Sequence, residues 1–469
     1  MLEHIRLSRA LTSSALVLAG CTGTFDATPV LAPPGEPERP IDVAVAAPTP
    51  ELPVVIGAPI VPDESRLLEG WHWEPMDEIV HYNAADIARR GRSTGTGLAV
   101  RVQPGSRDLL IMFQGGYGCS NPEICSFTAN HDGFAPNVHP WCEINRLPTE
   151  PDGVTCRTTS VDPSTGVETP LRGRYMHGDI FSDAPESPFA GFNFALLPYF
   201  SADYHAGDQD LPVRMRGRDY RFRGRDNVRA YLSRLVATFP DVDRVVLTGF
   251  SAGSLGALLN FERVRAAFRE VNPDVEVDVL GDSAAWLVES QDGVELGFSA
   301  CLQRRVRDIW RLDRGLPAGC TDCFTSDDGR FSEALMRYLL TTYPDSEFGF
   351  LLSDSDDVIE GVARTGQVAA NAEGERVACG RIDYSPTPYQ LYTQYRWSGL
   401  PNAMRAFGAM LGEHDNASML LMRSDRHVWT LDSMYDPARS TGQVLGVPAA
   451  PTTPVSIPDY VSDWLDGGY

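Results

Sequence analysis

The feature that most constrains this chain is a serine between two glycines within residues 244–260, RVVLTGFSAGSLGALLN. A β-branched run from Arg244 to Thr248 predicts a strand, and the small-residue, leucine-rich stretch after Gly253 predicts a helix. G-x-S-x-G at such a junction lifts the serine, here Ser251, clear of the strand and beside the N–H groups that start the helix. The flanking strand and helix favour a nucleophile over a structural turn. A nucleophile of this kind needs a base, an acid and an oxyanion hole elsewhere in the chain.

The composition is that of a globular chain large enough for one big domain or two ordinary ones. Its 469 residues are 43% hydrophobic and 22% charged. The net charge is −23, and all 40 basic residues are arginine. A chain this acidic repels phosphates, so we expect no nucleic-acid partner.

The N-terminus resembles an export signal. Arg6 and Arg9 precede an uncharged segment, residues 10–20, that ends in Leu-Ala-Gly before Cys21. This pattern is typical of a bacterial lipobox and predicts lipidation at Cys21, with a plain signal peptide as the alternative. The apolar run is too short to span a bilayer. We therefore expect an exported protein, anchored by lipid in the cell envelope, at the outer membrane or cell surface.

A proline- and alanine-rich stretch without amphipathic period follows the lipobox. The expected organisation is a signal peptide in residues 1–20, a tether in residues 21–66 and one folded domain in residues 67–469.

An even number of cysteines follows Cys21, which in an exported chain predicts up to four disulfides with open pairing. They are Cys119, Cys125, Cys142, Cys156, Cys301, Cys320, Cys323 and Cys379. The C-x-x-C pair at Cys320 and Cys323 has no second C-x-x-C and no histidine at ligand spacing, so we expect it to be structural. Residues 119–170 hold four of the cysteines and little periodicity, which predicts a disulfide-stapled insertion.

A glycine cluster follows a strand that we expect to be buried on both faces. Residues 108–113, DLLIMF, are almost continuously apolar and run into residues 114–121, QGGYGCSN. A glycine-rich loop at the end of a buried strand, well before the nucleophile, is suited to supply N–H groups to an oxyanion. The alternative is a glycine turn stiffened by a disulfide.

The candidate acid and base follow late strands. A predicted strand at residues 347–352 ends in an acidic cluster, Ser353 to Asp357. A calcium loop beginning at Asp354 is excluded by Ile359 and Thr365, which stand where glycine and glutamate are required. A predicted final strand at residues 417–422 is followed by His427. The resulting order of serine, aspartate and histidine differs from that of chymotrypsin or subtilisin.

At this point the chain resembles the pectin acetylesterase/Notum family of α/β-hydrolases. The resemblance spans roughly residues 108–429 and is carried by four blocks: Gly115 to Cys119 (GGYGC), Leu197 to Asp208, Gly249 to Ser254 (GFSAGS) and Gly281 to Ala284 (GDSA). It implies an α/β-hydrolase-like fold, with a mostly parallel sheet, helices on both faces and disulfide-stapled insertions. Residues 67–469 would then be the catalytic domain.

The resemblance also implies a mechanism without metal or organic cofactor. His427 would take the Ser251 proton and Asp356, with Asp357 and Asp354 as alternatives, would orient the imidazole. The N–H groups of Gly116, Tyr117 and Ala252 would stabilise the oxyanion. The expected activity is that of a serine carboxylesterase acting through an acyl-enzyme.

Three functions remain open from the sequence. The first is removal of short acyl groups, O-acetyl above all, from a polysaccharide such as pectin, on which Tyr117, Tyr199, Trp286 and Trp429 could stack or else fill the core. The second is an esterase for lipid or acylated peptide. The third, of a different class, is a non-catalytic surface lipoprotein that keeps the fold and acts by binding or as structure.

Overall fold

The computed structural model describes residues 53–363 and 399–469, without 63–66, 69, 90–94, 117, 121–124, 126–158, 162–167, 171–177, 216, 289, 292–293, 296, 327–328, 432 and 449. Cys21, Tyr117, Cys142, Cys156 and Cys379 therefore lie outside the described residues, and the expectations placed on them stay predictions. The boundaries of the signal peptide and of the tether also stay predictions.

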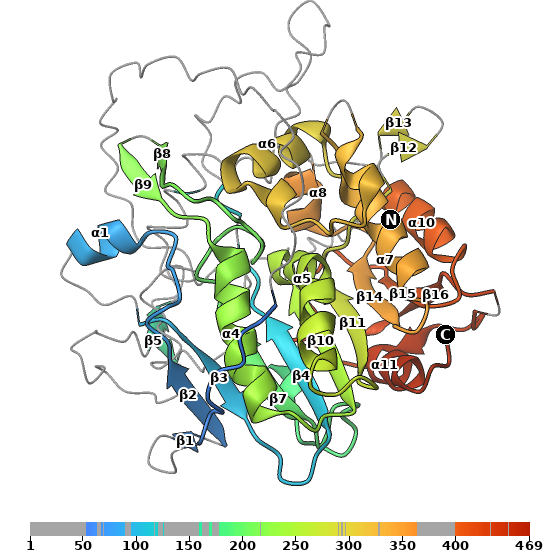
Figure 1. Ribbon diagram of the computed structural model, residues 1–469. Coiled ribbons are helices and arrows are strands. Elements are labelled where there is room, and N and C mark those ends of the chain that lie inside the picture. The colour runs from blue at the N-terminus through green and yellow to red at the C-terminus, as the bar shows by residue number, and fades with distance from the viewer. Residues whose placement is uncertain are drawn as a thin grey trace, which may run out of the picture.

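One large sheet organises the described residues (Figure 1). In spatial order its eleven strands are β1 (Leu67–Leu68), β2 (Trp71–Pro75), β3 (Gly97–Arg101), β7 (Asn193–Leu197), β4 (Asp108–Phe113), β10 (Arg244–Phe250), β11 (Glu276–Asp282), β14 (Phe348–Ser353), β15 (Ala417–Met422), β16 (Thr441–Leu445) and β17 (Val455–Ser456). The strands from β7 to β15 in this order are parallel, and the outer ones are antiparallel. The parallel centre is almost wholly buried, as its apolar runs predict.

The helices and the small hairpins surround this sheet. In the part of the chain that the structure describes, the α-helices are α1 (Ala84–Arg89), α4 (Gly224–Thr238), α5 (Ala252–Arg269), α6 (Ala300–Trp310), α7 (Ser332–Thr342), α8 (Asp357–Ala363), α10 (Leu400–Leu411) and α11 (Ile457–Leu465). Short 3₁₀ turns lie at Asp179–Phe181, Leu312–Arg314 and Thr321–Phe324. Two-stranded pairs form between β5 (Thr159–Val161) and β6 (Glu168–Pro170), between β8 (Val213–Met215) and β9 (Arg218–Tyr220), and between β12 (Ser290–Gln291) and β13 (Val294–Glu295).

Helices cover both faces of the sheet, which the alternation of side chains along β14 demonstrates. Phe348 packs on Phe261 of α5, with ring centroids 5.1 Å apart, and Phe350 packs on Phe407 of α10 at 5.2 Å. A Cβ on the intervening Gly349 would lie 2.9 Å from Nε1 of Trp464 in α11. Because neighbouring residues of a strand point to opposite faces, α5 and α10 lie on one face and α11 on the other. The predicted α/β-hydrolase-like fold, with a mostly parallel sheet and helices on both faces, is confirmed.

One expectation about the sheet is wrong. The strand at residues 417–422 was expected to be the last, but β16 and β17 follow it in the chain and extend the sheet antiparallel beyond β15. β16 pairs with β15 on one side and, over two residues, with β17 on the other, so the edge strand is β17, which has only two residues. β16 alternates exposed and buried positions from Thr441 to Val444, the pattern of a strand with one face on the core.

The end of the expected tether lies along α4. Gly57 N–H donates to the carbonyl of Ser233 at 3.0 Å, and the N–H of Ile60 donates to Thr238 Oγ1 at 2.8 Å. The side chains of Val54 and Ile60 are buried. Residues 53–62 therefore pack against the domain, upstream of the expected boundary at residue 67.

Two disulfides form among the described residues: Cys119 pairs with Cys125, and Cys320 pairs with Cys323. The first lies directly after the glycine cluster that follows β4. The second closes the C-x-x-C segment at the 3₁₀ turn Thr321–Phe324, with both cysteines buried.

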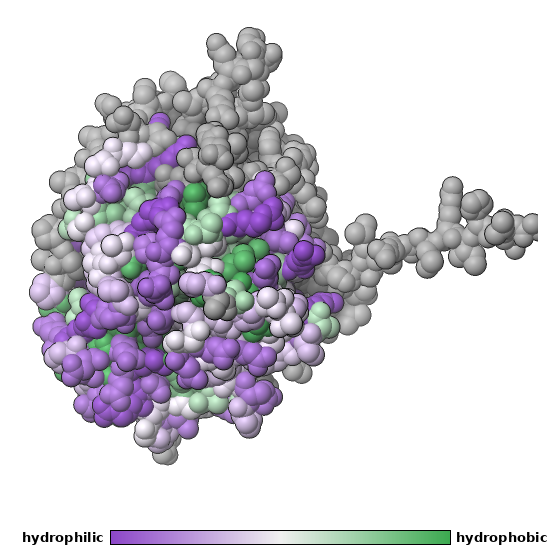
Figure 2. Space-filling model, turned by 90° about the vertical axis from the view of Figure 1, so that its right-hand side faces the viewer, coloured by the Kyte–Doolittle hydropathy of each residue, from purple (hydrophilic) through white to green (hydrophobic). Residues whose placement is uncertain are grey.

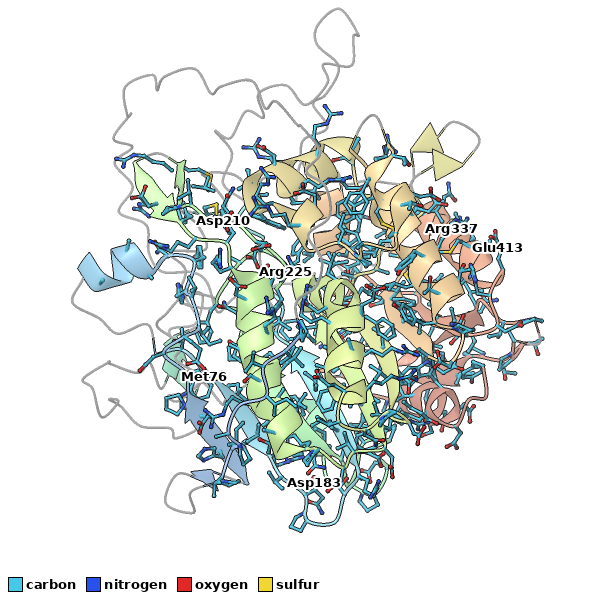
Figure 3. The ribbon with its side chains drawn as sticks, viewed as in Figure 1. Met76, Asp183, Asp210, Arg225, Arg337 and Glu413 are labelled. Atoms are coloured by element: carbon cyan, nitrogen blue, oxygen red, sulfur yellow. A yellow bond between two sulfur atoms is a disulfide. The ribbon has the colours of Figure 1, made fainter. Side chains whose placement is uncertain are left out.

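Ion pairs fasten helix ends to the loops around them (Figure 3). Arg225 at the start of α4 is buried and donates from Nη1 to Asp208 Oδ2 at 2.8 Å. Arg337 of α7 donates to Glu413 beyond α10 at 2.7 Å, and these side chains are 39% and 59% exposed. The buried pair ties the loop ending at Asp208 to α4, whereas exposed pairs of the second kind contribute little to stability.

The surface is mainly hydrophilic on the face shown in Figure 2, with small separate hydrophobic areas. None of the helices in the described residues is long and apolar enough to cross a membrane.

Candidate active site

Ser251 occupies a strained turn between β10 and α5. Its backbone has φ 55° and ψ −126°, a conformation that residues with a side chain rarely adopt and that costs on the order of 1–3 kcal/mol. Its N–H donates to the carbonyl of Asp282 at the end of β11, at 2.8 Å. Its hydroxyl has no hydrogen-bond partner among the described residues, and the side chain is partly exposed. The turn thus presents the serine as the G-x-S-x-G pattern predicts.

Glycine is required where β4 meets this turn. A Cβ on Gly253, in the first turn of α5, would lie 2.0 Å from the carbonyl oxygen of Phe113. A Cβ on Gly115, just after β4, would lie 2.2 Å from the carbonyl oxygen of Phe250. The glycine loop and the nucleophile turn are therefore in backbone contact, which only residues without a side chain permit.

The loop after β4 is held from several sides. The N–H of Gln114 donates to Leu197, and its carbonyl accepts from Nε2 of His205 at 2.9 Å. The N–H of Cys119 donates to Ala202 at 2.7 Å, and its carbonyl accepts from Nε1 of Trp310 at 2.9 Å. Gly116, one of the expected oxyanion donors, lies in the middle of this fixed loop.

His205 is a buried support rather than a base. Burial lowers its pKa to about 4, although the bond to Gln114 opposes this, so the ring is neutral at pH 7. The neutral ring donates its Nε2 proton to the Gln114 carbonyl and stacks on Tyr199, with centroids 4.6 Å apart. The sequence placed His205 in the second of the four blocks without a role. Its burial and its bond to Gln114, which the sequence does not reveal, identify it as one of the residues that hold the glycine loop.

Ala252 supplies the other expected donor. It is the first residue of α5, so its N–H precedes the helix's own hydrogen-bond ladder. The positive end of the helix dipole adds to the attraction that this position has for negative charge.

His427 and Asp356 form a pair at the same edge of the sheet. Nδ1 of His427 lies 2.8 Å from Oδ2 of Asp356. The other carboxylate oxygen accepts from the N–H groups of Val358 and Ile359 at 3.0 and 2.9 Å. The Asp356 side chain is 1% exposed and that of His427 is 13% exposed, so the imidazole retains access to solvent on one side.

The neighbouring aspartates do not share this position. Asp357 is the first residue of α8, and Asp354 accepts a hydrogen bond from the Ser355 hydroxyl at 2.9 Å. Both are only partly buried. Of the acidic cluster after β14, Asp356 is the residue that contacts His427.

The environment of His427 favours its charged form. Burial lowers the pKa of the imidazole, but the negative charge and hydrogen bond of Asp356, with the more distant charge of Asp282, outweigh burial and raise the pKa above 6.5. A raised histidine pKa strengthens the imidazole as a proton acceptor.

Asp282 joins the serine and histidine segments, a connection that the sequence did not predict. Its carbonyl accepts from Ser251, and its carboxylate accepts from the N–H groups of Trp429 and Thr430 at 2.9 and 2.8 Å. The sequence signal was its place in the GDSA block, residues 281–284, directly after a predicted strand, but no role was assigned to it. The described residues contain no group of three or more His, Cys, Asp or Glu arranged to hold a metal ion.

Comparison with known proteins gives consistent matches. The pectinacetylesterase family profile matches residues 157–348, which include Ser251. The palmitoleoyl-protein carboxylesterase Notum of Drosophila melanogaster is 23% identical over 275 residues, 57% of this chain and 36% of that protein. Palmitoleoyl-protein carboxylesterase notum2 of Xenopus laevis is 25% identical over 260 residues, 54% and 46% of the two chains. The chain thus spans less than half the length of these relatives.

The fold has a counterpart among solved structures. The Wnt deacylase Notum from Drosophila superposes with a TM-score of 0.51 and 17% sequence identity, over 84% of this chain and 92% of that one. At this identity the match establishes a shared fold.

We predict that Gly253→Ala prevents the native turn from forming. The added methyl group would lie 2.0 Å from a backbone oxygen of β4, so either the strand or the helix must move. Gly412→Ala is the matched control, because its Cβ would meet its nearest neighbour at 3.4 Å and its φ is −66°. Urea unfolding should show a loss of several kcal/mol, or no folded protein, for Gly253→Ala and a change within about 1 kcal/mol for Gly412→Ala. Equal stabilities would contradict the close approach.

We predict that His427 titrates above its ordinary value and that Asp356→Asn lowers its pKa. Removing the carboxylate removes the main charge that favours the imidazolium, while burial continues to oppose it. NMR titration of the His427 imidazole signals measures both values, with His205 as an internal control that stays neutral through this range. An unchanged His427 pKa in Asp356→Asn would show that the pair is not formed in solution.

Proposed function

We propose that this chain, which belongs with the pectin acetylesterase/Notum family as its motifs indicate, is a serine carboxylesterase that uses Ser251, His427 and Asp356. The observation that carries the proposal is the 2.8 Å contact between His427 and Asp356 at the sheet edge where the strained Ser251 turn also lies. Three segments far apart in sequence supply a nucleophile, a base and an acid in the order that α/β-hydrolases use.

The proposed reaction begins with proton transfer from Ser251 to His427. Since Nδ1 faces the Asp356 carboxylate, it carries the proton of the neutral ring, and Nε2 is free to accept from the serine. The serine oxygen attacks the ester carbonyl, and the tetrahedral oxyanion is stabilised by the N–H groups of Gly116, Tyr117 and Ala252. Each such donor typically lowers the barrier by about 3 kcal/mol.

Three further proton transfers complete the cycle. The imidazolium gives its proton to the departing alkoxide, which leaves an acyl group on Ser251. His427 then takes a proton from water as the water attacks the acyl carbonyl, and returns it to the serine oxygen as the acid is released.

The proposed substrate class is esters of short acyl groups, O-acetyl above all. Aromatic side chains fill the space on one side of the glycine loop: a Cβ on Gly118 would lie 2.8 Å from the ring of Trp310 and 2.9 Å from that of Tyr204. Trp286 packs on Phe331 in the same cluster, with centroids 5.2 Å apart, and is 2% exposed. These rings pack against the glycine loop, and the support for a short acyl group is the pectinacetylesterase match.

A polysaccharide such as pectin is proposed as the carrier of the acyl group on the strength of the pectinacetylesterase match. Trp286, Trp429 and Tyr199 are buried, at 2%, 0% and 8% exposure, so they fill the core and offer no surface for a sugar to stack on. The relatives named palmitoleoyl-protein carboxylesterases keep an acylated protein as the second candidate substrate. Export of the protein and lipid anchoring at Cys21 belong to the same proposal.

We predict that the full chain hydrolyses p-nitrophenyl acetate and that Ser251→Ala lowers kcat by at least about 10³-fold. Rates across acetate, butyrate and octanoate esters should fall as the acyl chain lengthens. Circular dichroism and thermal unfolding of the variant check that it is folded. A folded, disulfide-intact wild type without activity on any of these esters would contradict the esterase proposal and favour the non-catalytic binding alternative.

A further inference from the structure

A second buried carboxylate lies beneath the histidine loop. Asp282, the last residue of β11, is fully buried. Its Oδ2 atom accepts from the N–H of Trp429 at 2.9 Å, the N–H of Thr430 at 2.8 Å and the Thr430 hydroxyl at 2.7 Å. Burial raises the pKa of this carboxyl group, and the four donors that converge on it oppose the rise.

Ser283 extends the same contact to the residue next to His427. Its hydroxyl donates to Asp282 Oδ1 at 2.5 Å and accepts from the N–H of Val428 at 2.7 Å. Three consecutive backbone N–H groups, those of residues 428–430, are thus bound by one pair of neighbouring side chains. These hydrogen bonds fix the three residues that follow His427.

The backbone is strained at three of the residues that this network joins. Ser251, Ser283 and Val428 all have positive φ, at 55°, 62° and 75°. A β-branched residue such as Val428 is a marked outlier there, and the strain costs on the order of 1–3 kcal/mol. Such strain persists only where surrounding contacts over-determine the conformation, and the bonds from Asp282 and Ser283 are those contacts.

The same residue also binds the nucleophile turn. The carbonyl of Asp282 accepts the Ser251 N–H at 2.8 Å, and the N–H of Ser283 donates to Leu351 of β14, also at 2.8 Å. Residues 282–283 therefore contact all three segments that supply the proposed serine, acid and histidine.

We propose that Asp282 and Ser283 are positioning residues that lock the His427 loop onto the nucleophile turn and thereby set the relative placement of His427 and Ser251. The proposal rests on the proposed esterase function. Asp282 does not contact the reacting atoms. It acts through the backbone of residues 428–430 and through its charge.

The charge of Asp282 acts on His427 together with that of Asp356. The charges that act on the imidazole are those of Asp356, from the loop after β14, and Asp282, from the end of β11. Its charged chain neighbours are Asp425 and Arg426. The Arg426 guanidinium is directed to the Val428 carbonyl at 2.9 Å and lies over the Trp429 ring. The two carboxylates both raise the His427 pKa. Removing either charge should therefore keep the imidazole in its neutral, proton-accepting form to lower pH.

Two variants of the full chain separate the effect of the Asp282 charge on His427 from the effect of the hydrogen bonds to the histidine loop. Asp282→Asn keeps the shape of the side chain, with its amide oxygen able to accept from Trp429 and Thr430, and removes the charge. Ser283→Ala removes the bridge to Val428 and keeps the charge. The matched control is Asp278→Asn, a buried carboxylate at the other end of β11 that accepts a backbone N–H from Glu347 at 2.9 Å.

The measurements are the NMR titration of His427 and the pH dependence of kcat and KM on p-nitrophenyl acetate. We expect Asp282→Asn to lower the His427 pKa and to move the acid limb of the rate profile to lower pH. We expect Ser283→Ala to lower kcat by roughly ten- to a hundred-fold, with little change in KM, because the base is displaced from the nucleophile. Asp278→Asn should match the wild type in all three quantities.

The outcomes distinguish this inference from the proposed function. An unchanged His427 pKa in Asp282→Asn, together with an unchanged kcat in Ser283→Ala, would overturn the positioning role even in an active esterase. An inactive wild type would overturn the esterase function, while the His427 titration would still test the contact. If Asp282→Asn does not fold, Thr430→Val removes one of the four donors, and a kcat equal to that of the wild type would then count against the proposal.

Discussion

The site depends on the register in which β10 pairs with β11. Phe250 lies opposite Asp282, so the residue after each strand, Ser251 and Ser283, leaves the sheet at the same level. The Ser251 N–H then reaches the Asp282 carbonyl, and the Asp282 carboxylate reaches the histidine loop. A slip of one residue would turn Asp282 to the other face of the sheet. The register therefore sets the positions of Ser251 and of the histidine loop relative to each other.

The glycine loop, on the other side of Ser251 from the histidine, depends on contacts with a second buried segment. Residues 197–208 run behind the glycine loop and supply the contacts of Leu197, Ala202 and His205 to it. The buried ion pair of Arg225 with Asp208 fixes this block to α4. The oxyanion side and the histidine side of the site are thus supported by different parts of the chain that meet at the β10–α5 turn.

The positions of several strands were predictable from the sequence, but the contacts at the strand ends were not. The apolar runs at residues 108–113 and 417–422 coincide with β4 and β15, because burial on both faces leaves an unbroken hydrophobic pattern. Asp356 and His427 follow the adjacent strands β14 and β15, which is why these two residues, predicted from the sequence, lie close together in space.

The choice among the neighbouring aspartates depends on the conformation of one turn, and the role of Asp282 depends on long-range hydrogen bonds. Neither property leaves a local pattern. The strands β16 and β17 were missed because they are short, with five and two residues.

The most direct test of the central claim is covalent labelling of the full chain with a fluorophosphonate, followed by mass spectrometry of its peptides. An activated serine displaces fluoride from this probe and keeps the phosphonyl group on its oxygen. The account predicts one adduct on Ser251 that forms rapidly in the wild type and at least about 10³-fold more slowly in His427→Ala. Labelling of a different serine, or equal labelling of Ser251 in both proteins, would contradict it.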